Sequence, residues 1–119
     1  YTVGVITFRP TQREAEDYYR YSIVENADWT SVDDILVAKG ISPDQMPAEE
    51  FQKQRFMQAN GMSGLPIVGS PARVVMELAR LAMARLRGIG ISFVNFSDEL
   101  PYFCAEVLPR LEKMGLRAP

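Results

Sequence analysis

The sequence predicts an α/β fold in which parallel strands alternate with amphipathic helices. Three short segments, at 2–8, 65–68 and 88–96, are rich in β-branched and other apolar residues, as buried parallel strands are. The segments between and after them contain apolar residues at intervals of three and four, which is typical of helices that pack on a sheet. Three parallel strands leave both sheet edges unprotected, so the pattern also indicates that further strands belong to the sheet.

The first strand is predicted at Thr2–Phe8, where Pro10 follows its end. Thr11 precedes Glu14 by three residues, the spacing of a capping box, which predicts a helix that reaches about Val24.

A second helical segment is predicted over 26–40, opened by Thr30 or Ser31 and ended by Gly40. Residues 38–64 form an irregular helical insertion in this interpretation. Its last part, 60–64, contains glycines and small polar residues that pack poorly, so we expect a mobile, lid-like loop near a substrate entrance.

The second strand is predicted at Leu65–Val68, and Ser70 with Pro71 supplies the cap and first residue of a helix that ends near Arg87. The third strand lies within 88–96. The last helix is predicted to open at Ser97 and Asp98 and to run unbroken to Gly115. Its apolar stripe is expected to face the sheet: Leu100, Phe103, Cys104, Val107, Leu108, Leu111 and Met114.

The composition excludes several kinds of chemistry. The 119 residues contain no histidine and one cysteine, Cys104, so this chain by itself supplies no Ser-His-Asp or Cys-His machinery, no histidine-ligated metal site and no intrachain disulfide. The 13 basic residues are spread along the chain and outnumbered by 15 acidic ones, so nucleic-acid binding is not expected. No apolar run is long enough to cross a membrane, and a cytoplasmic location is expected.

Ligands of parallel α/β folds bind at the carboxyl ends of the strands, which here are the segments after Phe8, at Gly69 and at Asn95. Gly69 and Ser70 precede a helix N-terminus, whose free N–H groups favour an anion, so they are candidates for cofactor binding. The alternative is that Ser70 only caps its helix.

The substrate-pocket candidates are Phe8, Asn60, Asn95 and Phe96, which combine amide groups with flat apolar walls. Arg55, Gln58 and Asn60 precede the glycine-rich loop, where they could close over a bound anion or simply be solvated. The acidic pairs are expected on exposed helix segments or first turns, without forming a catalytic carboxylate pair: 33–34, 49–50 and 98–99.

Four segments resemble the carboxyl-terminal part of the bacterial luciferase-like, flavin-dependent monooxygenases, which include alkanesulfonate, alkane and pyrimidine monooxygenases. They are GLPIVGSPARV at 64–74, GIGISF at 88–93, ELPYF at 99–103 and EVLPRLEKMGLR at 106–117. RPTxxEAExYY at 9–19 also resembles the family.

The resemblance implies that residues 1–119 are the last three βα units of a (β/α)8 TIM barrel, with the insertion at about 38–64 between barrel strands 6 and 7. It implies an enzyme that takes reduced FMN from a separate flavin reductase and uses O2 to oxygenate a small apolar or sulfur-containing substrate. In this family most flavin contacts, the catalytic histidine and the interface between subunits belong to earlier strands. The catalytic residues are therefore unknown and expected upstream of Tyr1, a homo-oligomer is expected through that part, and the isolated segment is expected to be inactive.

The chain departs from the family pattern at two places. Members commonly carry Gly and Asp just before the final strand, where this chain has Arg85 and Arg87, and some carry an arginine where this chain has Asn60. Two alternatives remain: a small α/β binding or interaction module without catalysis, and a deazaflavin-dependent oxidoreductase of the same family.

Overall fold

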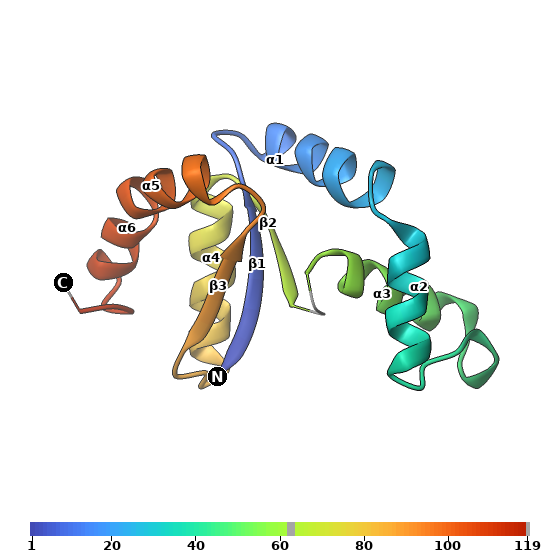
Figure 1. Cartoon of the computed structure of the whole chain (residues 1–119). Helices are drawn as coiled ribbons and strands as arrows, with labels where there is room; N and C mark the ends of the chain where they lie inside the picture. Colours follow the sequence, from blue (N-terminus) through green and yellow to red (C-terminus); the bar gives the residue numbers. More distant parts are fainter. Residues whose placement is uncertain (62–63, 119) are drawn as a thin grey trace.

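The structure, a computed structural model, describes residues 1–61 and 64–118 and contains a three-stranded parallel sheet flanked by helices (Figure 1). The described elements, in chain order, are β1 Thr2–Phe8, α1 Gln12–Tyr19, the π-helical turn η1 Arg20–Glu25, α2 Trp29–Ala38, the 3-10 turn η2 Pro43–Gln45, α3 Ala48–Ala59, β2 Leu65–Gly69, α4 Pro71–Met83, β3 Ile89–Phe93, α5 Phe96–Glu106 and α6 Leu108–Lys113. The predicted alternation of parallel strands and helices is therefore confirmed.

The strand order is β2-β1-β3, so the first strand lies in the centre of the sheet. Ile6 pairs in register with Ile67 on one side and Phe93 on the other. Consecutive strands of a (β/α)8 barrel are neighbours, so three successive barrel strands would place β2 in the centre, and the observed order differs from that expectation. Pro66 favours an edge position for β2 because it has no N–H to donate to a second neighbour.

One face of the sheet carries the main hydrophobic core. Ile6 and Phe8 of β1 point out of the sheet on this face. Apolar side chains of α4, α5 and α6 pack against them. The buried members of this core are Ile6, Phe8, Ile67, Val74, Val75, Leu78, Phe93, Phe103, Val107 and Leu111.

The opposite face carries Val3, Val5 and Thr7, which alternate with the core-facing residues of β1. Val5 and Thr7 are buried, whereas Val3 is 57% exposed. This face is therefore covered over its centre and open toward the start of β1.

The predicted capping box is confirmed: Thr11 Oγ1 accepts the N–H of Glu14, and the Glu14 carboxylate accepts the N–H of Thr11. The predicted start of the second helix is wrong by two to three residues. Asp28 is its N-cap and accepts the N–H of Ser31, because a carboxylate is as good an acceptor for a first helical turn as a hydroxyl.

Helix α4 ends at Met83, four residues before the predicted end at Arg87. The chain leaves the helix through Arg85, whose φ of 63° is in the left-handed region. Among the described residues, Arg85 is the one non-glycine with positive φ. A residue in the left-handed region ends a helix. The spacing of apolar residues, from which the end at Arg87 was predicted, does not indicate where such a residue lies.

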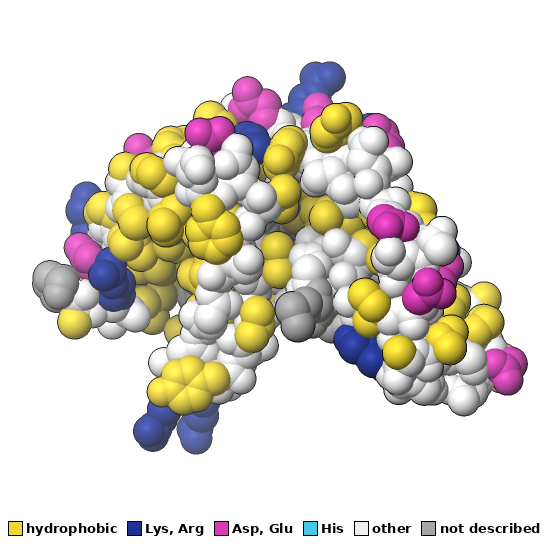
Figure 2. All heavy atoms as spheres, in the orientation of Figure 1, with side chains coloured by type: hydrophobic (Ala, Val, Ile, Leu, Met, Phe, Trp, Pro, Cys, Tyr) yellow, Lys and Arg dark blue, Asp and Glu magenta, His cyan; other side chains and the backbone are white. Residues whose placement is uncertain are grey.

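The last helix is not unbroken, because it divides at Val107 into α5 and α6. Pro109 lacks the N–H that a continuous helix would bond to Ala105, so α6 starts anew with proline in its first turn. Leu100, Cys104 and Met114 are exposed, contrary to the predicted stripe. In α5 the buried face is instead the one that carries Glu99 and Phe103. Figure 2 shows hydrophobic side chains gathered over α5 and α6 on the visible face.

The predicted insertion at about 38–64 contains η2 and α3, and α3 packs against α2, the helix that precedes the insertion. Arg55 binds Asp33 with both Nε and Nη2, at 2.7 and 3.0 Å, and its guanidinium lies 4.8 Å from the centre of the Trp29 ring. Gln58 accepts a hydrogen bond from Lys39 at 2.6 Å. Arg55 and Gln58 therefore join the two helices, which differs from both the lid and the solvated interpretation.

The predicted lid loop at 60–64 includes residues 62 and 63, which lie outside the described residues. At its described ends, Asn60 and Gly64 are buried.

Candidate functional site

The carboxyl ends of β1 and β3 are joined by the side chain of Glu99, in the first turn of α5. Its Oε1 accepts the backbone N–H of Phe8 at 3.0 Å, and its Oε2 accepts the backbone N–H of Asn95 at 2.7 Å. Glu99 is 2% exposed. A buried carboxylate with several donors is a strong clamp, because its charge shortens and strengthens each hydrogen bond.

Arg9 supplies the positive charge at the same place. Its Nη1 donates to Glu99 Oε1 and to the carbonyl of Phe8, both at 2.7 Å. The guanidinium lies 3.8 Å from the centre of the Tyr18 ring, a cation–π contact that connects this pair to α1. The Arg9 N–H donates to the carbonyl of Gly69 at 3.4 Å, which connects the end of β1 to the end of β2.

Gly69 and Ser70 lie where β2 passes into α4. Ser70 caps the helix, since its Oγ accepts the N–H of Arg73 at 3.5 Å, and its own N–H donates to Gln12 Oε1 at 3.3 Å. A Cβ on Gly69 would lie 2.7 Å from both Gln12 Oε1 and the Arg73 side chain. The glycine therefore allows α1 and α4 to approach, and two N–H groups of the predicted anion site already have partners within the chain.

The structure does not bring the four substrate-pocket candidates together. Phe8 packs in the core, with its ring centre 4.8 Å from that of Tyr102, whereas Asn60 lies against the opposite face of the sheet, where Val5 points. Alternation along β1 separates these two side chains. Asn95 caps α5 through the N–H of Asp98, and Phe96 is 52% exposed beside Phe93.

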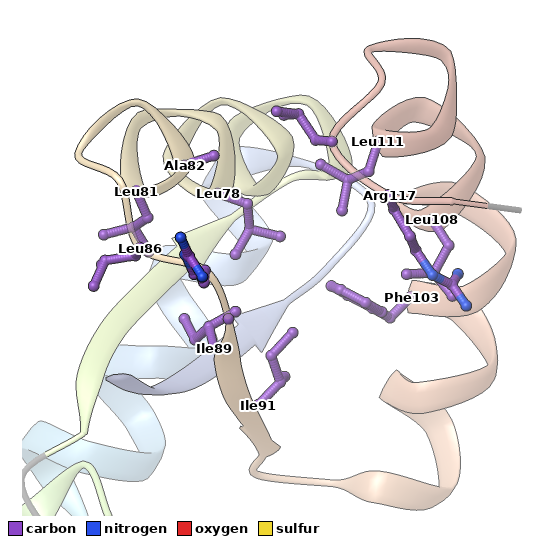
Figure 3. Close-up of a pocket in the computed structure, with 13 residues that line it drawn as sticks. Leu78, Leu81, Ala82, Leu86, Ile89, Ile91, Phe103, Leu108, Leu111 and Arg117 are labelled. Carbon is purple, nitrogen blue, oxygen red and sulfur yellow. The ribbon is translucent and has the colours of Figure 1, made fainter. Parts of the chain in front are cut away.

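Two hollows flank the sheet, one toward the start of β3 and one beside β2. The first, of about 230 Å³, lies between α4, β3 and the last two helices; in Figure 3, Leu78, Ile89 and Phe103 line it with other apolar side chains, and Arg117 lies at its side. The second contains Tyr19 with charged residues of α1 and α4. Burial raises the pKa of the Tyr19 phenol above its usual 10.0, so it is a neutral donor at physiological pH.

A third cavity, of about 360 Å³, lies on the face that Val5 occupies, between β1, β3 and the ends of η1 and α3. Asn60 lines it and is 2% exposed. Within residues 1–61 and 64–118, neither its Oδ1 nor its Nδ2 has a hydrogen-bond partner.

Sequence reasoning missed Glu99, because an acidic residue in the first turn of a helix is usually solvated and interacts favourably with the helix dipole. The available signal was Arg9, a cation directly after a buried strand whose carboxyl end meets the start of α5. Asp98 and Glu99 lie in the first turn of α5, as predicted, but Glu99 is buried there, which the sequence did not indicate.

Among the described residues, no three His, Cys, Asp or Glu side chains gather where they could hold a metal ion. The helices described here include none with the length and apolar character needed to cross a membrane. Comparison of the chain with protein-family models, with curated proteins and with solved structures finds no match.

Proposed function

We propose that this chain is the carboxyl-terminal part of a luciferase-like monooxygenase, which uses reduced FMN and O2 to oxygenate a small apolar or sulfur-containing substrate. The reduced flavin comes from a separate reductase, and the chain forms three βα units of the barrel. The catalytic groups and the interface between subunits belong to the preceding part of the protein. The location in the cell is proposed to be cytoplasmic.

The observation that carries this proposal is the meeting of the resembling segments at one end of the sheet. Arg9 comes from the RPT segment, Gly69 from the GLPIVGSP segment and Glu99 from the ELPYF segment. Arg9 is hydrogen-bonded to both of the others. Residues separated by up to 90 positions thus form one cluster at the strand ends, where parallel α/β enzymes build their sites.

The backbone at Arg85 gives independent support. Members of the family commonly carry glycine at the matching place, and glycine is the residue that adopts a positive φ without steric cost. Arg85 has a φ of 63°, so the chain keeps the conformation although it lacks the glycine.

The flavin does not fit a site made from this chain alone. The N–H of Ser70 and that of Arg73 are already bound to Gln12 and to the Ser70 hydroxyl, and the Glu99 carboxylate fills the space between the ends of β1 and β3. A cofactor role for Gly69 and Ser70 therefore stays a prediction for the complete protein.

A second candidate, an interaction module without catalysis, is favoured by the strand order. The order β2-β1-β3 is how doubly wound sheets begin. The two candidates differ in which strand pairs with β3, so backbone NOEs in the complete protein separate them. Contacts between Val5 and Ser92 favour the module, and contacts between β2 and β3 favour the barrel.

The proposal is tested by titrating FMN, followed by flavin fluorescence, into the 119-residue chain and into the protein encoded by the complete reading frame. We expect weak or no binding by the chain, because one wall of a pocket buries too little of the ligand, and clear binding by the complete protein. Absence of flavin binding by the complete protein overturns the monooxygenase assignment. Micromolar binding by the short chain contradicts the view that most of the site lies elsewhere.

A further inference from the structure

The hollow of about 230 Å³ toward the start of β3 has apolar walls that come from α4, β3 and the last two helices. Figure 3 shows Leu78 of α4, Ile91 of β3 and Leu108 of α6 around the same space. Ile91 and Leu108 pack against the core but are only partly buried, as are Leu81 and Ile89. An apolar ligand in the hollow would remove more of this surface from water, which favours binding.

The end of α4 forms one side of the hollow. Arg85, in the left-handed region, donates its N–H to the carbonyl of Ala82 at 2.9 Å, and Leu86 donates its N–H to the carbonyl of Leu81 at 3.3 Å. These two hydrogen bonds form a Schellman motif, which brings the residue after the left-handed one against the last turns of the helix. Both leucines line the hollow, and the exposed side chain of Arg87 follows at its rim.

The end of α6 has the same arrangement on another side. Gly115, with a φ of 70°, donates its N–H to the carbonyl of Glu112 at 2.9 Å, and Leu116 donates its N–H to the carbonyl of Leu111 at 3.0 Å. Leu111 and Leu116 line the hollow, and the exposed Arg117 follows. Two Schellman motifs therefore each supply the hollow with a leucine and, directly after it, an arginine.

The charge at this rim is mainly positive. Arg117 donates from Nη1 to Glu112 Oε1 at 3.4 Å, whereas no carboxylate of the described residues forms an ion pair with Arg87. Arg85 and Lys113, at the same two helix ends, leave the basic residues in excess over Glu112. Basic residues also interact favourably with helix C-termini, which accounts for their presence there but not for the apolar hollow between them.

We propose that this hollow binds a free medium-chain carboxylate, whose alkyl chain fills the apolar space. The ligand carboxylate pairs with the guanidinium of Arg87, and Arg117 adds a second positive charge at the rim. The volume is below the range of about 300–1,000 Å³ that drug-sized ligands occupy, so it suits a single alkyl chain. This site uses residues of this chain alone and does not depend on the proposed function.

The test is photolabelling of the protein encoded by the complete reading frame, without flavin, by an octanoate that carries a diazirine in its alkyl chain. Mass spectrometry of peptides locates the label, which we expect within 78–91 and 103–117. Octanoate, 1-octanol and octyltrimethylammonium share the chain and differ in the charge of the head. Octanoate should displace the label from these segments at about tenfold lower concentration than either of the others, because only its head pairs with an arginine.

Three variants complete the design. Arg87→Gln should weaken labelling of these segments about tenfold, and Arg80→Gln, which removes an exposed arginine of α4 that does not line the hollow, should leave it unchanged. Ala82→Leu places a larger side chain in the hollow and should abolish this labelling. Absence of label from both segments of the wild type, equal displacement by the three octyl compounds, or equal losses in Arg87→Gln and Arg80→Gln each overturn the proposal. The first two outcomes need no variant to fold, and none of the three depends on whether the complete protein binds flavin.

Discussion

The carboxylate of Glu99 accepts the backbone N–H of Phe8 at 3.0 Å, across 91 positions of the sequence. This bond attaches the start of α5 to the end of the central strand. Because the same carboxylate also binds Arg9 and the N–H of Asn95, its removal leaves three donors without their acceptor.

Replacement of Glu99 is therefore expected to destabilise the fold. Glu99→Leu should lower the free energy of unfolding by about 3–5 kcal/mol, since it leaves the Arg9 charge partly buried and unpaired. Glu99→Gln keeps the shape and should cost about 1–3 kcal/mol. Urea unfolding followed by circular dichroism measures both. Glu49→Gln, at an exposed site, is the control and should change stability by less than about 0.5 kcal/mol. A similar loss of stability in all three variants would contradict a stabilising role for the buried Glu99 carboxylate.

Arg85→Gly is expected to stabilise the protein. The left-handed backbone conformation at Arg85 costs a residue with a side chain about 1–2 kcal/mol, which glycine avoids. Glycine also makes the unfolded chain more flexible, which offsets part of that stabilisation. The net increase in the free energy of unfolding should therefore be about 0.5–1 kcal/mol. Arg87→Gly makes the same chemical change at a position without positive φ and should destabilise by about 0.4–1 kcal/mol. Thermal unfolding of the two variants checks the difference in sign, and equal effects would argue against a strained backbone at Arg85.

Phe103 and Leu100 test which side of α5 faces the core. Phe103 is 4% exposed and contacts the rings of Phe8 and Phe93, so Phe103→Ala should cost about 3–5 kcal/mol. Leu100 is 42% exposed, and Leu100→Ala should cost less than about 1 kcal/mol. Denaturant unfolding at one temperature compares them directly. A larger loss for Leu100 would mean that α5 is rotated relative to the sheet.

These comparisons also show how far sequence reasoning reaches. The period of apolar residues and the capping box at Thr11 predicted β1 and α1 because both depend on neighbouring residues alone. The position of Leu100 was mispredicted because the stripe was drawn through apolar residues alone, whereas the buried face of α5 includes the carboxylate of Glu99 beside Phe103.

The order of the strands and the side-chain contacts at the candidate site could not be predicted from local residue patterns. The central position of β1 depends on which strand edges meet, and Pro66 was the one sequence sign that β2 prefers an edge. At the candidate site, the backbone N–H groups at Gly69 and Ser70 were predicted to bind an anion, with the alternative that Ser70 only caps its helix. Only the placement of Gln12 showed that the Ser70 N–H has a partner within the chain. Phe8 and Asn60 were assigned to one pocket because residue order near strand ends does not specify the face of the sheet.

A pH effect is expected at the start of α2. Hydrogen bonds from the Ser31 side chain and backbone lower the pKa of Asp28 below its usual 3.8. A carboxyl group with a lowered pKa in the folded state contributes stability above the unfolded value, and this contribution is lost as the pH falls through the folded value. Asp28→Asn keeps a capping side chain that does not titrate. The stability advantage of the wild type over this variant should therefore shrink between about pH 4 and pH 2, as followed by urea unfolding; an advantage that stays constant over this range would contradict the assignment.

Incorporation of ¹⁸O₂ tests most directly the proposal that this chain is part of a flavin-dependent oxygenase. The protein encoded by the complete reading frame is supplied with FMN, a flavin reductase and NADH under ¹⁸O₂, together with a panel of small apolar and sulfur-containing compounds. We expect one ¹⁸O atom to appear in the product of at least one compound while the other is released as water, and this labelling to require both FMN and the complete protein. Absence of an oxygenated product across the panel, or formation of equal amounts without FMN, would contradict a flavin-dependent oxygenase.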